Sequence, residues 1–215
     1  MHRQLENGSR KKERNAKDKV LSVNVGWQLE ARTGAQQAVP AALSVASQIE
    51  FESFRMDVTS CTKADYDQIV THIQEFWGSD RTLNLHHPMF VYEFGNSAYI
   101  IKDENQVAAY LFGFISQTEP TAYVHLVGVR EPYRRQGLAG RLYDHFVRFA
   151  LIQGCTELKA ITTPSNKESI AFHRSLGMEL TGKLNRDGVQ VIKDYAGPGQ
   201  DRVLFRKILT QADAA

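Results

Sequence analysis

Six residues in the middle of the chain have the types and the spacing of a phosphate-binding turn. They are Arg134, Arg135, Gln136, Gly137, Ala139 and Gly140. Small residues let backbone N–H groups approach a bulky anion, and the N-terminus of a helix adds about half a positive charge. The alternative is an ordinary strand-to-helix turn in which glycine only permits close packing. The stretch lacks the G-K-[ST] of a Walker loop, and Leu142 stands where a dinucleotide fingerprint needs a small residue.

His125 is a candidate for proton transfer, because the unperturbed pKa of imidazole, near 6.5, suits a base at neutral pH. It lies within residues 121–129, an alternating run typical of a strand. The alternation predicts that Tyr123, Val127 and Val129 lie on the same face of that strand as His125. The alternative is a partly buried histidine that is hydrogen-bonded inside a sheet.

Apolar periodicity and turn signals predict alternating strands and helices around these residues. Strands are predicted at residues 51–58, 97–102, 107–115, 121–129, 158–163, 178–184 and 203–209, and helices at 62–77, 137–153 and 165–177. Thr62-Lys63-Ala64-Asp65 and Ser165-Asn166-Lys167-Glu168 are predicted capping boxes, and Gly177 fits a left-handed helix end. We therefore expect one α/β domain with a largely antiparallel N-terminal half and a βαβαβ-like C-terminal half.

Composition and charge argue against several classes of protein. The 215 residues carry 26 Lys and Arg against 24 Asp and Glu, and a net charge of +2 does not require a nucleic-acid partner. The sequence contains no run of about 18 apolar residues, so it predicts no membrane span. Cys61 and Cys155 are too few for a disulfide scaffold or a four-ligand zinc site. His86 and His87 have no third ligand at a recognisable spacing, so we expect no metal site, and a cytoplasmic location is the default.

Residues 1–50 differ from the rest of the chain. They are polar, carry a basic cluster at residues 10–14 and show no sustained apolar period. We expect a disordered or extended N-terminal segment there, with a nucleic-acid or membrane-surface arm as the alternative. Met56 is a candidate natural start, because folded-looking sequence begins beside it. The folded domain is predicted over residues 51–212.

Two blocks of the sequence together carry a family resemblance. Arg134-Arg135-Gln136-Gly137-Leu138-Ala139 fits an Arg/Gln-x-x-Gly-x-Gly/Ala motif, and residues 166–178 fit an Asn-x-x-(Ser/Ala)-…-Tyr-x-x-x-Gly-Phe helix, except at His173 and Met178. Both blocks resemble the GNAT superfamily of acetyl-CoA-dependent N-acetyltransferases, which usually has Tyr and Phe at those two positions. The resemblance covers about Met56 to Leu209. It implies an α/β (α+β) fold with a central mixed, mostly antiparallel twisted sheet flanked by helices.

The resemblance implies acetyl-CoA as the co-substrate. Its pyrophosphate would lie on the backbone from Gln136 to Gly140, and its pantetheine arm would pair like an extra strand with the strand that ends at Val129. The implied cofactor-binding residues are Val127, Val129, Arg134, Arg135, Gln136, Gly137, Ala139, Gly140 and Asn166. For Arg135 the alternative is a solvated side chain, and for Asn166 it is a place beside a helix cap.

The implied reaction is direct attack of a primary amine on the thioester in a ternary complex, without a covalent enzyme intermediate. The predicted catalytic side chains are His125, His173 and Tyr123. His125 is the predicted base, the Val129 N–H the predicted donor to the thioester oxygen, and His173 the predicted acid in place of the family's Tyr. For His173 the alternative is a helix-surface residue packed beside Phe172.

The acceptor amine is left unidentified among small amines, amino acids and protein amines. By family analogy, residues 86–94 and 193–201 are expected beside it. Asp194, Tyr195 and Asp201 are candidates for holding a cationic amine, with ordinary turn residues as the alternative. The alternative function is a non-catalytic acyl-CoA-binding sensor or regulatory module. No membrane partner is expected, nucleic acid is a weaker alternative, and a homodimer is left open.

Overall fold

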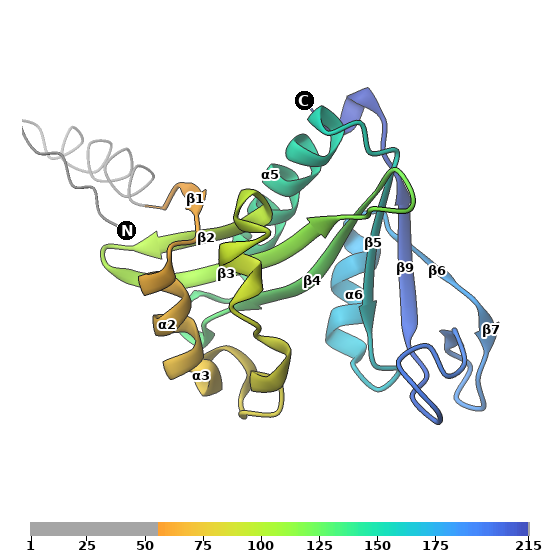
Figure 1. Cartoon of the computed structure of the whole chain (residues 1–215). Helices are drawn as coiled ribbons and strands as arrows, with labels where there is room; N and C mark the ends of the chain where they lie inside the picture. Colours follow the sequence, from red (N-terminus) through yellow and green to blue (C-terminus); the bar gives the residue numbers. More distant parts are fainter. Residues whose placement is uncertain (1–55, 215) are drawn as a thin grey trace, which may run out of the picture. The chain divides into compact units, whose positions relative to one another are not determined.

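The computed structural model describes residues 56–214. The expectations for residues 1–50 and for most of the 51–58 strand lie outside these residues. Within residues 56–214 no helix is long and apolar enough to cross a membrane. A central sheet with helices on both faces makes up this part of the chain (Figure 1).

The central sheet has seven strands and is mixed and mostly antiparallel, as predicted. Its strands, in order across the sheet, are β1 (Val58–Ser60), β2 (Ala98–Asp103), β3 (Gln106–Ile115), β4 (Thr121–Val129), β5 (Glu157–Thr162), β9 (Val203–Ile208) and β6 (Glu179–Thr181). Neighbouring strands are antiparallel, except that β4 and β5 run parallel. Because β9 is inserted between β5 and β6, the second parallel pair of the predicted βαβαβ arrangement does not form.

Helices cover both faces of the sheet and divide the core into two clusters. One face, which we call the α5 face, carries α5 (Leu138–Ile152) and α6 (Lys167–Ser175), and the other, the α2 face, carries α2 (Lys63–Thr71), α3 (Ile73–Trp77) and α4 (Met89–Tyr92) (Figure 1). Short 3-10 segments are η1 (Leu83–Leu85), η2 (Gly95–Ser97), η3 (Glu131–Tyr133) and η4 (Gln211–Ala214). Leu142 and Phe146 pack in the cluster on the α5 face, and Ile69 and Phe76 in the cluster on the α2 face.

The capping box predicted for the first helix is confirmed. The Thr62 hydroxyl accepts the Asp65 N–H (3.3 Å), and the Asp65 carboxylate accepts the Thr62 N–H (3.0 Å). The cap predicted for α6 is wrong by one residue, because Asn166, not Ser165, is the N-cap, and its side-chain oxygen accepts the Ser169 N–H (3.1 Å). Gly177 has the predicted left-handed conformation, with φ of 75°.

The strand predicted at residues 178–184 is divided in two. β6 ends at Thr181, and β7 (Lys183–Leu184) pairs with β8 (Gln190–Val191) in a separate two-stranded sheet. Gly182 stands between them with φ of 109°, and a Cβ there would lie 2.2 Å from the Val191 carbonyl oxygen. Only glycine fits this close approach, and the chain leaves the main sheet at this residue.

Candidate active site

The strands β4 and β5 pair over only part of their length. The register runs from Thr121 with Glu157 to Val124 with Ala160, and there the pairing ends. Beyond that point the two strands diverge (Figure 1). We call the end of the pairing the fork, and residues 125–129 of β4 the open edge, since β5 does not pair with them.

Two backbone N–H groups point outward from the open edge. The Arg130 N–H donates to the Ala108 carbonyl (2.9 Å), so it faces β3. Because the direction of N–H groups alternates along an antiparallel strand, the N–H groups of Val127 and Val129 face away from β3. The Val129 carbonyl accepts a hydrogen bond from Arg134 Nε (3.2 Å). The open edge therefore offers donors to an extended ligand, as an unpaired sheet edge does.

A β-bulge at His125 changes the face that β4 side chains take. Leu126 pairs with Phe112, and Val124 pairs with the next residue of β3, Gly113, so His125 has no residue opposite it. Val124 packs in the cluster on the α5 face, whereas Leu126 packs in the cluster on the α2 face. An extra residue in one strand shifts the two-residue alternation and reverses the faces beyond it.

The expectation that four β4 side chains share one face is therefore wrong. Tyr123 stacks on Phe114 (5.0 Å between ring centroids), which packs against the cluster on the α2 face. Val127 and Val129 pack against the cluster on the α5 face. A phenol and an imidazole thus lie on one side of the sheet at the fork, and two valine side chains lie on the other.

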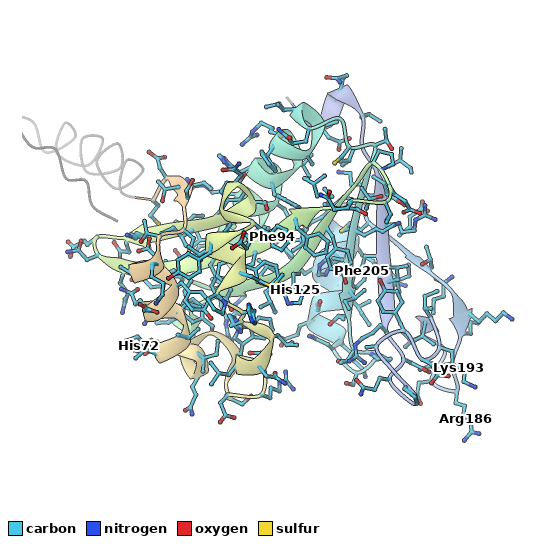
Figure 2. All side chains as sticks on the ribbon, viewed as in Figure 1. His72, Phe94, His125, Arg186, Lys193 and Phe205 are labelled. Atoms are coloured by element: carbon cyan, nitrogen blue, oxygen red, sulfur yellow. The ribbon has the colours of Figure 1, made fainter. Side chains whose placement is uncertain are left out.

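His125 is held by two groups from the α2 face. Its Nε2–H donates to the Leu85 carbonyl (3.1 Å), and its ring stacks on Phe90 at 4.6 Å (His125 is labelled in Figure 2). Burial lowers the pKa of His125 below 6.5, so the ring is neutral at neutral pH. With Nε2 carrying the proton, Nδ1 keeps a lone pair, and no hydrogen bond to it is found within residues 56–214. This nitrogen can accept a proton.

Tyr123 stays protonated at neutral pH. Burial is the main cause that raises its pKa above the ordinary value of 10, and its interaction with the Tyr195 hydroxyl raises it further. Its hydroxyl can therefore donate or accept a hydrogen bond at the fork, but it is a poor source of a proton-abstracting phenolate.

The N-terminus of α5 presents uncapped donors. Gly137 is the N-cap, with φ of 79°, and no side chain caps the helix. The first bond inside the helix runs from the Arg141 N–H to the Gly137 carbonyl (3.1 Å), which leaves the N–H groups of Leu138, Ala139 and Gly140 without an intrahelical acceptor. No acidic residue lies in the first turn, and a Cβ on Gly140 would meet no atom within 4 Å. An anion can approach these donors.

In the loop before α5, two polar side chains bond to backbone carbonyls and a third is exposed to solvent. Arg134 donates from its Nη2 to the Phe76 carbonyl (2.9 Å) at the end of α3, and Gln136 donates to the Pro132 carbonyl (3.1 Å). Arg135 is exposed and has a left-handed backbone, with φ of 60°. Arg134 and Gln136 therefore hold the loop in shape, and Arg135 is the guanidinium left in solvent.

Comparison with known families decides the relationship. The profile of the Acetyltransferase (GNAT) family matches residues 65–178, more than half of the chain. The chain belongs to the GNAT family. The type 1 aminoglycoside N(6')-acetyltransferase of Serratia marcescens is 34% identical over 68 residues, which are 32% of this chain and 47% of that protein. This GNAT chain thus spans about half the length of the curated relative it matches.

Solved GNAT structures share the fold. A protein of the GNAT family from Desulfovibrio desulfuricans has a TM-score of 0.58 at 15% identity, covering 72% of this chain and 99% of that one. The ribosomal-protein-S18-alanine N-acetyltransferase of Escherichia coli has a TM-score of 0.54 at 18% identity, covering 73% and 95%. A chain of the NatC complex bound to Gag peptide and CoA has a TM-score of 0.57 at 14% identity, covering 73% and 99%. At these identities the likeness concerns the fold alone.

His173, at the position of the tyrosine in the GNAT helix motif, lies in the interior, so the surface alternative is wrong. Its side chain stacks on Phe205 of β9 at 4.2 Å, and the residue is 4% exposed. Its Nδ1–H donates to the Ser169 carbonyl (2.7 Å), and its Nε2 accepts from the Tyr143 hydroxyl (2.7 Å). Burial lowers the pKa of His173 below 6.5, so the ring is neutral at neutral pH.

Tyr143 was not found by sequence reasoning. It follows Leu142 on the buried face of α5, where an aromatic residue is typical of a core. Its hydroxyl meets His173 from a helix 30 residues away in the chain. Nothing in the spacing of the two residues could have indicated the contact.

The adjacent histidines of the GNAT domain separate in the structure. His86 is buried, and its Nδ1–H donates to the Thr82 carbonyl (2.8 Å) while its Nε2 accepts from the Tyr110 hydroxyl (2.5 Å). His87 is exposed. Within residues 56–214 no group of three or more His, Cys, Asp and Glu side chains is placed to hold a metal ion.

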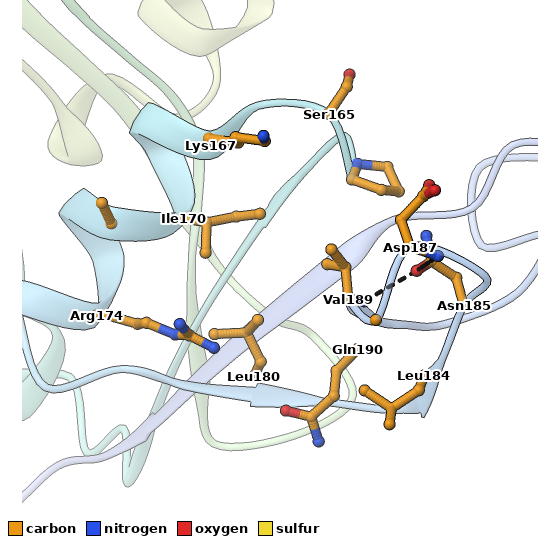
Figure 3. A pocket seen from close by; sticks show the side chains of 13 residues that line it. Ser165, Lys167, Ile170, Arg174, Leu180, Leu184, Asn185, Asp187, Val189 and Gln190 are labelled. Carbon is orange, nitrogen blue, oxygen red and sulfur yellow. Dashed lines mark hydrogen bonds between the residues drawn. The ribbon is translucent and has the colours of Figure 1, made fainter.

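A separate cavity of about 930 Å³ lies between α6 and the β7–β8 hairpin (Figure 3). Lys167, Ile170 and Arg174 line it from α6, and Leu184 and Asp187 line it from the hairpin. None of the predicted site residues lines this cavity. It is therefore distinct from the fork and the open edge.

Proposed function

We propose that the chain transfers the acetyl group of acetyl-CoA to a primary amine by direct attack in a ternary complex. The observation that carries the proposal is the arrangement of β4. Its open edge runs from His125 at the fork to Val129, beside the loop that leads to the uncapped N-terminus of α5. Membership of the GNAT family supports the same reaction class.

Acetyl-CoA is assigned to the open edge of β4 and the N-terminus of α5. Its pyrophosphate is assigned to the N–H groups of Leu138, Ala139 and Gly140, because they are uncapped donors at a helix N-terminus with free space above Gly140. The pantetheine arm is assigned to the open edge, where the N–H groups of Val127 and Val129 face outward. Arg135 is exposed and adds a positive charge at the phosphate end.

The proposed donor to the thioester oxygen is the Val127 N–H. The sequence-based expectation was the Val129 N–H, but successive residues of a strand are about 3.3 Å apart, so Val127 is nearer to His125. The amine must contact both the base and the thioester carbon, which favours the nearer donor. The Val129 N–H is then assigned to an amide of the pantetheine arm. One such donor contributes roughly 10²–10³-fold to the rate.

His125 is the proposed base. The amine nitrogen bonds to the acetyl carbon while Nδ1 takes the amine proton, directly or through water, and the C–S bond then breaks with the electron pair leaving on sulfur. The Leu85 carbonyl on Nε2–H fixes the tautomer and favours the imidazolium that forms. General-base help of this kind contributes roughly 10²–10⁴-fold. Tyr123 is proposed to orient the reacting groups through its hydroxyl.

His173 stays the proposed source of the proton for the departing thiolate. The neutral ring carries its proton on Nδ1, where the Ser169 carbonyl accepts it, and its Nε2 accepts from the Tyr143 hydroxyl, so only the protonated form of His173 has a proton on Nε2 to pass to the thiolate through that hydroxyl. A thiol has an ordinary pKa of about 8.5, so the thiolate is also a tolerable leaving group without help. We therefore expect replacement of His173 to affect the rate less than replacement of His125.

The test is thiol release from acetyl-CoA with an amine panel, measured against pH for His125→Gln and His125→Ala. In the unchanged protein, kcat/KM should fall as the pH drops through the lowered pKa of His125, because protonated Nδ1 cannot accept a proton. Both variants should lose roughly 10²-fold or more in rate together with this limb of the profile. His72→Gln is the matched control, since His72 is exposed and bonds to Glu75 away from the fork (labelled in Figure 2). An unchanged profile in His125→Gln removes His125 from the mechanism.

The second candidate function is a non-catalytic acyl-CoA sensor. The observation that favours it is His173, which replaces the motif tyrosine and has both ring nitrogens bonded inside the protein. Calorimetric titration with acetyl-CoA separates the two functions when it is combined with the thiol assay. Binding without thiol release from any amine would identify the sensor.

A further inference from the structure

Aromatic side chains form a continuous row on the α2 face beside the fork. Phe90 stacks on His125 and contacts Phe94 at 5.9 Å between ring centroids. Phe94 contacts Phe114 at 5.8 Å, and Phe114 stacks on Tyr123 at 5.0 Å. Figure 2 labels His125 and Phe94. We call these five residues the aromatic row.

Exposed apolar side chains border the row. Leu85 is 44% exposed, and its carbonyl bonds to His125, so η1 lies directly beside the row. From the loop before β9, Tyr195 is 42% exposed, and its hydroxyl interacts with that of Tyr123. Exposed apolar groups gathered around one point are typical of a binding surface.

Each carboxylate of the loop that carries Tyr195 accepts one N–H from the loop's own backbone. The Asp194 carboxylate accepts the Gly199 N–H (2.6 Å), and the Asp201 carboxylate accepts the Asp194 N–H (2.9 Å). These bonds fix both side chains in the turn but use only one oxygen of each carboxylate, whereas the groups that meet at the fork itself, the Tyr123 hydroxyl and the His125 imidazole, are neutral. A molecule with several ammonium groups needs several available carboxylates to replace its hydration. The surface at the fork is better matched to one ammonium group and an apolar body.

We propose that the acceptor is a small primary amine with a single positive charge, carried on an aromatic or apolar skeleton that lies on the partly exposed members of the aromatic row, which are Phe94, Phe114, Tyr123 and His125. This inference rests on the proposed function. Ring faces attract both an apolar group and an ammonium group. His125 belongs to the row, so an amine that projects from a ring lying on the row is directed toward Nδ1. Leu85 and Tyr195 would cover the skeleton from solvent.

The experiment compares four acceptors with saturating acetyl-CoA in the thiol-release assay. They are 2-phenylethylamine, ethylamine, kanamycin and a tetrapeptide with a free N-terminus. We expect kcat/KM for 2-phenylethylamine to exceed that for ethylamine by at least about 10-fold, because the phenyl ring is buried against apolar groups. Its kcat/KM should also exceed those for kanamycin and the peptide.

Surface variants locate the preference. Leu85→Ser and Tyr195→Ser should each reduce the ratio of 2-phenylethylamine to ethylamine by about 3-fold or more, since both side chains are exposed and border the row. Leu184→Ser is the matched control, because Leu184 is 70% exposed on β7 and lines the separate cavity. It should leave the ratio unchanged. A ratio that is the same in all three variants would remove the row from acceptor binding.

The outcomes separate this inference from the proposed function. Faster turnover of kanamycin or the peptide, or equal turnover of ethylamine, overturns the inference and leaves acetyl transfer intact. Binding of acetyl-CoA without thiol release from 2-phenylethylamine also overturns it. Failure to bind acetyl-CoA overturns the proposed function itself.

Discussion

Replacing Gly140 by Asp separates helix stability from cofactor binding at the N-terminus of α5. A side chain fits there, because an added Cβ meets no atom within 4 Å and the backbone is not left-handed. A carboxylate in the first turn of a helix stabilises it by about 0.3–1 kcal/mol, and removal of glycine adds a few tenths. The free energy of unfolding of Gly140→Asp should therefore rise by about 0.5–1 kcal/mol. For a chain of this size that corresponds to about 1–4 °C in Tm.

The same carboxylate should weaken the binding of coenzyme A. Two negative charges of the diphosphate at about 5 Å from the carboxylate are repelled by about 1.7 kcal/mol at the dielectric constant of water, and by more where protein excludes water. Because 1.4 kcal/mol is a factor of ten in affinity, Kd should rise about 16-fold or more. The variant is thus expected to be more stable and to bind less tightly.

Gly140→Asn is the matched control, because its side chain has the same size without the charge. Calorimetric titration with coenzyme A should give a much larger Kd for Gly140→Asp than for Gly140→Asn. The difference should shrink in about 1 M salt, where the Debye length is about 3 Å. Equal Kd values for Gly140→Asp, Gly140→Asn and the unchanged protein would refute the assignment of the diphosphate to this helix end.

Three further predictions concern stability. His173→Leu leaves the buried Tyr143 hydroxyl without its acceptor and should lower the free energy of unfolding by about 1–3 kcal/mol in urea denaturation, whereas Tyr143→Phe combined with it should recover part of the loss. Full additivity of the two changes would contradict the contact. Gly113→Ala would bring a Cβ within 2.6 Å of the Phe146 ring and should cost about 1–3 kcal/mol, so an unchanged Tm would speak against this packing. Because burial lowers the pKa of His86 and His173 below 6.5, the unfolded chain binds protons first as the pH falls, and stability should decline below about pH 6.5 by at most about 1.4 kcal/mol per pH unit for each histidine. The decline should be shallower in His173→Leu.

Much of the fold follows from short-range patterns. The capping box at Thr62 and the bounds of β4 were predicted correctly, and the bounds of β2 and β3 to within one residue, since each depends on residues a few positions apart. The cap of α6 was assigned one residue too early, because Ser165 and Asn166 are both good N-cap residues and only the backbone decides between them. The predicted strand at residues 178–184 failed at Gly182, whose close approach to Val191 cannot be read from neighbouring residues.

The sequence by itself was enough to predict that small and basic residues lead into α5 and that His125 lies in a strand, because both predictions depend on local spacing. Only the tertiary structure decided on which face of the sheet the candidate catalytic side chains lie. The bulge at His125 depends on how β3 pairs with β4, and it moves Tyr123 and His125 to the face opposite Val127. The Leu85 carbonyl, 40 residues away in the chain, decides which ring nitrogen of His125 carries the proton. The Tyr143 hydroxyl, 30 residues away, plays the same part for His173. Contacts at such separations arise from packing, which no local pattern encodes.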